Sequence, residues 1–525
     1  MDEFIAKHRE EVIGTLSGFD RLVFRGTLRS IAFPDGFSHY LHKSAILLKH
    51  YAAHVKQVSA RLKRASLAVA EALKRPIEYL TSSKVSKEEL AKEIAARDEI
   101  RQGLICVLSA VEPCWTFEIH RNRERQMLEL VSRQRKCLFL YHYWMDPMFG
   151  LMNARIQTWF PFAIQVCLNG REWLARQMDA HGIRYVAQGN CFPWVEDWTE
   201  AQRLMNQQLR SDWPTILDRI AGQLNPIHDT IFSQHPVRYY WSTYQHEWAI
   251  DVVFRDPAYL HRLYPRLIHH GMANMGSSDV MRYLGKRLLK SGEIPSNFSG
   301  EVVSTLKERE EGVRIKHAVN GNSGKLYDKA YTELGSVLRG EITFQNTKDL
   351  RAYRAKEGDP DGPKSWRPMR RGIADLHRRA ELSEKAAERY LDAYAAADED
   401  TTLEELLAKL KKSTVWGNRR VRALRPLDED RDLLSAVARG EFTFTGFRNR
   451  DLQRLLFSSP PDSPAEARRR SAWISRKLRL LRAHSLITKI HGTHRYQLND
   501  SGHKTITAIL TALGSTVRQL TALAA

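Results

Sequence analysis

Alternating and helical hydrophobic patterns follow one another through the N-terminal part of the chain. Residues 18–30 alternate apolar and polar positions, which is typical of a half-buried strand, and residues 39–75 carry the spacing of a long helix. Two segments rich in aromatic and β-branched residues, 136–144 and 153–170, are separated by a turn sequence and predict a hairpin. These patterns predict a domain of mixed α and β structure over residues 1–225.

A second set of strand patterns begins near residue 230. Residues 239–254 form a long apolar strand pattern, and polar-apolar strands follow over 314–329 and 336–344, with a helical stretch before them. This order predicts a compact central α+β domain over residues 230–355. A segment rich in Pro, Gly and charge comes next, and the helical patterns after it predict a helical connector over 356–425.

The last hundred residues, 426–525, follow the order helix, helix, long basic helix and hairpin, closed by a final helix. This order predicts a winged helix-turn-helix. In the basic helix Ile474, Leu478 and Leu481 fall on one side, so the charged side is free for a partner. A winged helix that contacts another protein is the alternative. The residues expected to contact DNA are Arg468, Arg469, Arg470, Arg476, Lys477, Arg479, His494 and Arg495.

The fold class predicted from these patterns is therefore α+β and multidomain, with mixed sheets in the N-terminal and central domains. The amino-acid composition also indicates the kind of partner that the protein binds. The 525 residues include 81 Lys and Arg against 61 Asp and Glu, a net charge of +20, and 43% are hydrophobic, too many for a disordered basic tail. A folded protein of this charge usually binds a polyanion, most often nucleic acid, with membrane surfaces and heparin-like polymers as alternatives.

Several common protein classes are disfavoured by what the sequence lacks. No run approaches the roughly 20 apolar residues of a membrane span, and the charged N-terminus is unlike a signal peptide, so we expect a cytoplasmic protein without a membrane partner. The five cysteines form no CxxC pair and are expected to be reduced thiols. Motifs of ATPases, Rossmann dehydrogenases, α/β-hydrolases and zinc proteases are missing. A homodimer is left open.

Acidic and basic residues on the central strands suggest chemistry on phosphates. Glu247 and Asp251 are four residues apart and so share one face of their strand, and Glu341 lies on a later strand. These three carboxylates are the expected ligands of Mg²⁺ or Mn²⁺, which would polarise a phosphodiester. The cations expected to offset the developing negative charge are Lys325, Lys329 and Arg339, and the expected nucleophile is Tyr327.

The same residues resemble a known family. The segments Trp248-Ala-Ile-Asp251, Lys325-Leu-Tyr-Asp-Lys329 and Leu338-Arg-Gly-Glu341 are similar in order to the motifs of replication initiators of rolling-circle plasmids and filamentous phages, over roughly 110 residues. The resemblance implies a domain that nicks and joins DNA through a 5′-phosphotyrosine. Asp251 and Glu341 match the family's acids, and Tyr327 matches its motif tyrosine, with Tyr331 as a second candidate. No His-x-His pair is present, so a metal would need carboxylate ligands.

We therefore expect a DNA-binding protein of mobile-element or replication-initiator type with metal-dependent strand nicking and transfer. The alternative is a non-enzymatic nucleic-acid-binding or regulatory protein, in which the central acids are ion-paired to Lys325 or Arg339. A third hypothesis is an RNase H-like nuclease that uses Asp251, Asp328 and Glu341 with two metals.

Two features of the N-terminal part are further candidates. One is an isolated strand acid, Asp20, which has no second acid at a strand spacing. An aromatic run could stack the bases of a single strand, although core packing is the commoner explanation. Its members are Tyr141, Tyr143, Trp144, Trp159 and Phe160.

Overall fold

The computed structural model describes residues 1–82, 85–124, 126–286, 288, 294–295, 298–309, 312–347, 350–356, 359, 361–395, 403–417, 419–439, 442, 446–490 and 492–514. The chain divides into two compact units. The first comprises residues 1–286 and 299–398, and the second comprises residues 287–298 and 399–525. Both contain helices and strands, which confirms the predicted α+β multidomain class.

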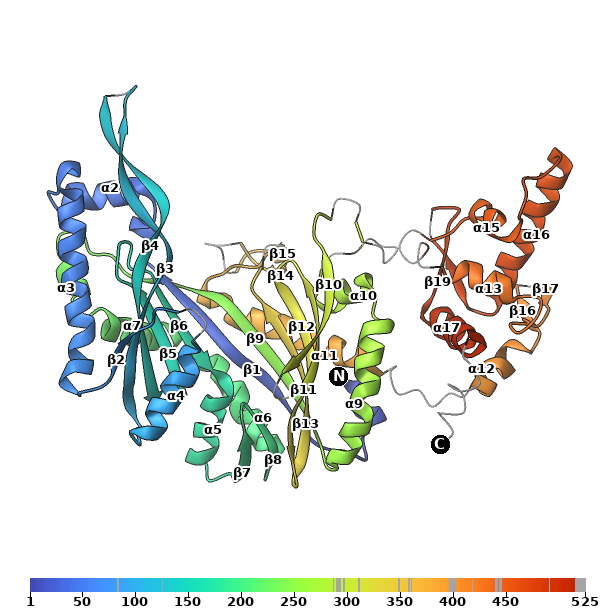
Figure 1. The fold of residues 1–525 in the computed structure, drawn as a ribbon, viewed down its shortest axis with the longest axis horizontal. Helices are drawn as coiled ribbons and strands as arrows, with labels where there is room; N and C mark the ends of the chain where they lie inside the picture. Colours follow the sequence, from blue (N-terminus) through green and yellow to red (C-terminus); the bar gives the residue numbers. More distant parts are fainter. Residues whose placement is uncertain are drawn as a thin grey trace. The chain divides into compact units, whose positions relative to one another are not determined.

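The first unit is built on long strands (Figure 1). Its strands are β1 (Val12–Thr27), β2 (Ile77–Tyr79), β3 (Gly103–Asn122), β4 (Met127–Asp146), β5 (Gly150–Gln157), β6 (Ile164–Asn169), β7 (Tyr185–Gln188), β8 (Cys191–Val195), β9 (Tyr240–Phe254), β10 (Val302–Arg309), β11 (Gly312–Val319), β12 (Asn322–Thr332), β13 (Gly335–Phe344), β14 (Arg351–Arg354) and β15 (Ser365–Pro368). Its helices are α1 (Asp2–Lys7), α2 (Pro34–Lys43), α3 (Tyr51–Ala72), α4 (Lys87–Arg97), α5 (Gly170–Ala180), α6 (Trp198–Gln207), α7 (Trp213–Leu224), α8 (His228–Ile231), α9 (Pro257–Ala273), α10 (Ser277–Tyr283) and α11 (Leu376–Ala395).

Eleven of these strands form one sheet in the order β10-β11-β12-β13-β9-β1-β6-β5-β4-β3-β2. The structure therefore differs from the prediction of separate N-terminal and central sheets with a boundary between residues 225 and 230. The reason is that β1 pairs antiparallel with β9 along nearly its whole length, from Val12 opposite Phe254 to Thr27 opposite Tyr240. Pairing between strands so distant in sequence leaves no mark in the local hydrophobic pattern.

Helices cover the two faces of this sheet. On one face α11 packs on β9 and β13, and α9 and α10 pack beside it. The imidazole of His246 in β9 meets the hydroxyl of Ser383 in α11 at 2.8 Å on that side. On the opposite face α5 and α6 pack on β1, and β8 lies against β12 and β13. Because α11 is part of this layer, the predicted connector over 356–425 is divided between the two units.

The β3–β4 hairpin is the longest pairing in the sheet. Its register runs from Gly103 opposite Met145 to Asn122 opposite Met127. Figure 1 shows these two strands continuing beyond their neighbours as a two-stranded ribbon, with α3 beside it. The hairpin predicted between 136–144 and 153–170 is confirmed as β4–β5, whose turn is held by Asp146 Oδ1, the acceptor for the backbone N–H groups of Met148 and Phe149.

The second unit has its own hydrophobic core. Its elements are α12 (Leu403–Leu410), β16 (Thr414–Trp416), β17 (Arg419–Val421), α13 (Arg431–Val437), α15 (Asn449–Leu456), α16 (Pro464–Ala483), β18 (Ile487–Lys489), β19 (Tyr496–Leu498) and α17 (Asp500–Gly514). The basic helix α16 starts with Ser463 as its N-cap and buries Ile474, Leu478 and Leu481, as its spacing predicts. A single bridge between Phe447 and Tyr496 adds a third extended segment beside the β18–β19 hairpin.

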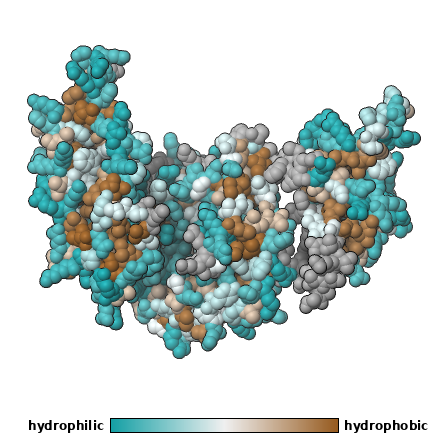
Figure 2. Space-filling model, in the orientation of Figure 1, coloured by the Kyte–Doolittle hydropathy of each residue, from teal (hydrophilic) through white to brown (hydrophobic). Residues whose placement is uncertain are grey.

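Among the described helices, none combines the length and the hydrophobicity that a membrane crossing requires. On the face drawn in Figure 2, hydrophilic residues predominate and hydrophobic residues form separate patches.

Candidate functional site

The candidate site lies on the sheet face opposite α11. In β9, His246 and Trp248 point one way, so Glu247 and Asp251 share the other face. The register with β13 places Arg339 opposite Asp251, and it places Glu341 opposite Ala249, between Glu247 and Asp251. The prediction that Glu247 and Asp251 share one face of their strand is therefore confirmed, and β13 adds Glu341 to that face.

A β-bulge brings a third strand's acid into the site. Phe19 of β1 is opposite Trp248 and Arg21 is opposite Glu247, so Asp20 is an extra residue without a partner in β9. A bulge of this kind redirects a side chain. One carboxylate oxygen from each of Asp20, Glu247 and Glu341 lies within 4.8 Å of the other two, and all three residues are buried. We call these three residues the carboxylate cluster.

The predicted metal ligand Asp251 lies outside this cluster. Arg339 donates to its two oxygens from Nε at 2.5 Å and from Nη2 at 2.8 Å, and Arg171 Nη2 approaches at 3.1 Å. Arg171 comes from the first turn of α5, whose start packs so closely on β1 that a Cβ at Gly170 would lie 1.9 Å from the carbonyl oxygen of Phe19. Asp251 is thus an ion-pair partner, which corrects its assignment as a metal ligand.

Arg339 connects this ion pair to the carboxylate cluster. Its Nη1 lies 3.3 Å from Asp20 Oδ1, and its Nη2 donates to the carbonyl oxygen of Asn190 at 2.5 Å. The Asn190 side chain in turn donates to Asp20. Burial opposes the charge on Arg339, but Asp251 and Asp20 hold its pKa well above the ordinary value. Arg339 is therefore a structural cation that positions two acids.

Glu341 sits between a cation and a phenol on β12. Lys325 pairs with its Oε1, and the hydroxyl of Tyr327 donates to its Oε2 at 2.5 Å. Burial acts to raise the pKa of Glu341, but the charge and hydrogen bond of Lys325 and the hydrogen bond of Tyr327 lower it overall. Burial and the charge of Glu341 raise the pKa of Tyr327 well above its ordinary value. In this arrangement Tyr327 is a protonated phenol that solvates Glu341.

Glu247 is the least stabilised acid of the cluster. Gln245 donates to its Oε1 at 3.0 Å, and Arg21 approaches its Oε2 only to 4.0 Å. Burial and the neighbouring negative charge of Glu341 raise its pKa. The side chains of its cationic neighbours Arg21 and Lys325 are 48% and 17% exposed, whereas the three carboxylates are buried.

The three carboxylates fit a divalent cation by their chemistry. Mg²⁺ and Mn²⁺ prefer oxygen ligands, and the spread of 4.8 Å between oxygen atoms is compatible with ligands of one ion after small side-chain shifts. A cation there would relieve the repulsion between Glu247 and Glu341 that raises the pKa of Glu247. It would compete with Lys325 for Glu341.

A band of cations continues from the cluster toward the sheet edge. Lys316 of β11 is paired with Lys325, and Arg314 is paired with Tyr327, so both lie on the site's face. Next along the sheet, Lys307 of β10 is opposite Arg314. Burial and the neighbouring charges of Lys325, Lys307 and Arg314 lower the pKa of Lys316. This concentration of like charge is suited to a polyanion that crosses β10–β12.

Other predicted residues lie elsewhere. Asp328 and Tyr331 point to the face of α9, where Tyr331 contacts His261, so the predicted set of Asp251, Asp328 and Glu341 is not brought together. Burial raises the pKa of Asp328 to about 7. The ammonium of Lys329, next to a bulge in β12, lies 5.7 Å from the ring centroid of Tyr327.

The predicted DNA contacts of α16 fall into two groups. Exposed side chains are those of Arg468, Arg469, Arg476 and Arg479, and His494 is exposed on the loop between β18 and β19. By contrast, Lys477 pairs with buried Asp430 at 2.5 Å, and Arg470 pairs with Glu466 at 2.6 Å. Arg495 donates to the carbonyl oxygen of Gly446 at 3.1 Å. These three residues are held by intramolecular contacts, and their contact with DNA stays a prediction.

No protein family model matches the chain, and no curated protein matches it. The site residues that sequence reasoning missed or ranked low are Asp20, Arg171, Asn190 and Arg21. The sequence predicts the strand that contains Asp20, but it carries no signature of the bulge that turns the Asp20 side chain toward Glu247. Arg171 follows Asn169, whose side chain caps α5 by accepting from the N–H groups of Arg171 and Glu172, and that cap was the only available signal.

Proposed function

We propose that the chain is a DNA-binding protein of mobile-element or replication-initiator type that nicks DNA with Mg²⁺ or Mn²⁺ at the carboxylate cluster. The observation that carries this proposal is the convergence of Asp20, Glu247 and Glu341 beside a band of cations. Carboxylates and cations together suit phosphodiester chemistry, because the acids hold a metal and the cations attract and orient the polyanion.

Each residue has a separate task in this proposal. Asp20, Glu247 and Glu341 would hold the ion, which supplies polarisation of the scissile phosphate. Lys316 and Arg314 would bind the strand on either side of that phosphate, and Lys325, released from Glu341, would lie beside the developing negative charge. Arg339 and Asp251 would hold β13 and β9 in register and fix Asp20.

Strand transfer would add a covalent step at Tyr327. The phenol would give its proton to Glu341 and its oxygen would form a bond to phosphorus. The bond between phosphorus and the 3′ oxygen would break, and the leaving 3′ oxygen would take up the proton from Glu341 by way of water. The resemblance to rolling-circle initiators supports this step. The hydrogen bond from Tyr327 to Glu341 provides the proton acceptor, whereas the burial of the phenol requires a local rearrangement before it meets DNA. Without that rearrangement water would be the nucleophile.

The second unit would supply DNA recognition. The order α13, the bridge at Phe447, α15, α16 and the β18–β19 hairpin supports the proposal of a winged helix-turn-helix, in which α16 would be the recognition helix. Four exposed arginines of α16 are available for phosphates or base edges, namely Arg468, Arg469, Arg476 and Arg479.

A non-enzymatic DNA-binding protein is the second candidate. It is favoured by the ion pairs themselves, since Arg339, Arg171 and Lys325 already balance Asp251, Asp20 and Glu341 without a metal. In that case the sheet would be a scaffold for the DNA-binding surfaces.

A cleavage assay separates the two candidates. Supercoiled and labelled single-stranded DNA would be incubated with Mg²⁺, Mn²⁺ or EDTA and with the wild type or Asp20→Asn, Glu247→Gln or Glu341→Gln. The matched control is Asp328→Asn, which alters a buried acid on the other face of the same sheet. Metal-dependent nicking that all three cluster variants lose and the control keeps would support the proposal. DNA binding without nicking would overturn it in favour of the scaffold.

The same assay with Tyr327→Phe decides the nucleophile. A covalent protein–DNA adduct that disappears in Tyr327→Phe is expected for strand transfer. Nicking that persists in this variant without an adduct would contradict transfer and indicate hydrolysis.

A further inference from the structure

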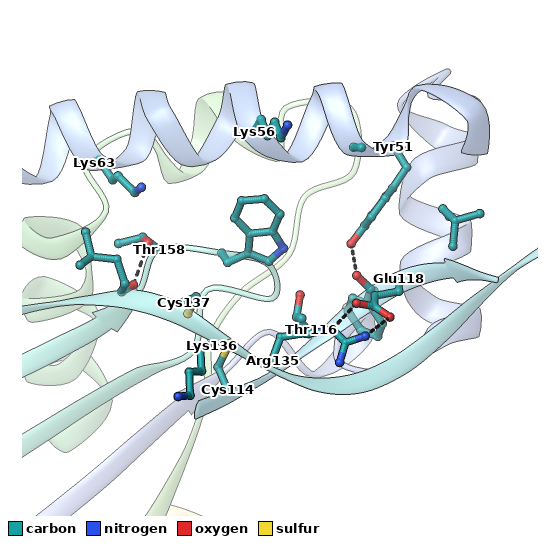
Figure 3. A pocket seen from close by; sticks show the side chains of 15 residues that line it. Tyr51, Lys56, Lys63, Cys114, Thr116, Glu118, Arg135, Lys136, Cys137 and Thr158 are labelled. Carbon is teal, nitrogen blue, oxygen red and sulfur yellow. Dashed lines mark hydrogen bonds and ion pairs between the residues drawn. The ribbon is translucent and has the colours of Figure 1, made fainter. Parts of the chain in front are cut away.

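A second site lies between α3 and the β3–β4 hairpin. A pocket of about 630 Å³ is present there, a size typical of small-molecule sites, and no residue that lines it belongs to the carboxylate cluster. Figure 3 shows Lys56 and Lys63 on the helix at one side and Lys136, Cys114 and Cys137 on the strands at the other.

The pocket carries an excess of positive charge. Lys56, Lys63 and Lys136 line it, and none of them forms an ion pair with another described residue. The acid of the lining, Glu118, is neutralised by Arg135, whose Nη2 donates to its Oε2 at 2.8 Å. The lining groups therefore comprise four cations and one anion, and the three lysines are available to an anionic ligand.

An aromatic side chain completes the wall. Trp159 lines the pocket and is half-buried, whereas Tyr141, Tyr143 and Phe160 of the same aromatic run are buried in the core. Nearby, the hydroxyl of Tyr51 donates to the carbonyl oxygen of Phe117 at 2.6 Å and ties α3 to the hairpin. A tryptophan next to unpaired lysines favours a ligand that has both a planar ring and a phosphate.

We propose that this pocket binds a nucleotide unit, with its phosphates on Lys56 and Lys63 and its base stacked on Trp159. The unit would be either a free nucleotide or part of a single strand, because both present the same base and phosphate. This proposal does not depend on the nicking proposal. The pocket would bind a nucleotide with the same affinity if the carboxylate cluster had only a structural role.

The test uses the full chain and measures binding by calorimetry and fluorescence anisotropy. The probes are ATP, adenosine, inorganic triphosphate and a fluorescein-labelled oligonucleotide of thymidines. The variants are the double charge reversal Lys56→Glu with Lys63→Glu, and Trp159→Phe. The matched control is Arg61→Glu with Arg64→Glu, which makes the same charge change on α3 at positions that do not line the pocket.

The pocket variant should weaken ATP or oligonucleotide binding by about tenfold or more, and the control by less than about threefold. Trp159→Phe should weaken binding of ATP but not of triphosphate. Binding of the oligonucleotide without ATP would identify the strand as the source, and tight ATP binding would identify a free nucleotide. The proposal is overturned if neither probe binds, if both charge reversals weaken binding equally, or if triphosphate binds as tightly as ATP.

Discussion

The guanidinium of Arg339 holds the carboxylate of Asp251 through two hydrogen bonds, from Nε at 2.5 Å and from Nη2 at 2.8 Å. Both side chains are almost fully buried, and Arg171 approaches the same carboxylate at 3.1 Å. Two buried guanidinium groups thus depend on Asp251, with Asp20 as a weaker second partner of Arg339. Asp251 belongs to the framework of the site.

Replacing Asp251 should therefore cost stability before it affects chemistry. Asp251→Ala leaves Arg339 and Arg171 with an uncompensated buried charge, which typically costs about 3–5 kcal/mol. Urea unfolding followed by tryptophan fluorescence measures the loss in the free energy of unfolding. Asp328→Asn, which removes a buried acid that has no ion pair among the described residues, is the comparison and should lose clearly less. Equal losses in the two variants would refute the framework role.

The raised pKa of Glu247 predicts a pH-dependent affinity for metal. A cation must displace the proton that burial and Glu341 favour, so Mn²⁺ binding should weaken as pH falls through the raised pKa, above the ordinary glutamate value of 4.5. Thermal unfolding with and without Mn²⁺ between about pH 5 and 7.5 measures this effect. The increase in Tm that Mn²⁺ produces should become smaller as pH falls.

The variants Glu247→Gln and Glu341→Gln are the controls for this metal effect. Both should abolish the rise in Tm at every pH, because each removes one carboxylate from the cluster. Without metal, wild type should gain stability relative to Glu247→Gln as pH falls, since the folded state binds the Glu247 proton more tightly than the unfolded state. A Tm rise that survives in both variants would place the metal elsewhere.

The sequence predicted individual strands and helices well, because each carries its own hydrophobic period. The buried side of α16 and the β4–β5 hairpin follow directly from local pattern and turn chemistry. The shared face of Glu247 and Asp251 also followed from the period of a strand. Strand order did not, because the pairing of β1 with β9 joins segments more than 200 residues apart.

The candidate site was accordingly predicted only in part. Glu247 and Glu341 meet as expected, but the third carboxylate is Asp20, which a bulge in β1 redirects. Motif matching favoured Asp251, yet a motif cannot show that Arg171 of α5 would reach the same carboxylate. The charge on α16 was likewise visible, whereas the capture of Lys477 by Asp430 depends on a tertiary contact.

The ion pairs of Asp430 predict that the second unit loses stability in acid. Its buried carboxylate accepts from Arg422 at 2.8 Å and Lys477 at 2.5 Å, and although burial acts to raise its pKa, these partners lower it to about 2. The depressed pKa contributes stability above the unfolded value of about 3.9, and this stability is lost as pH falls toward 2. Hydrogen exchange of α13 and α16 should therefore accelerate over that range in the wild type.

Asp430→Asn tests this assignment. At neutral pH the variant should already show faster exchange in α13 and α16, and the acid-dependent change between about pH 4 and 2 should become smaller. The first unit serves as an internal reference, because its exchange should not respond to the substitution. An unchanged pH profile in the variant would assign the acid sensitivity to other carboxylates.

The two kinds of cation on α16 predict different consequences for DNA binding. Arg476 and Arg479 are exposed, so Arg476→Ala with Arg479→Ala should weaken binding and reduce the slope of log affinity against log salt by about 2, if each contacts one phosphate. Lys477→Ala should instead destabilise the second unit, because it leaves Asp430 with one cation fewer, and should change the salt slope little. Anisotropy with labelled duplex at several salt concentrations, alongside urea unfolding, measures both. If Lys477→Ala lowered the salt slope as much as the arginine pair and left stability intact, α16 would meet DNA through its other side.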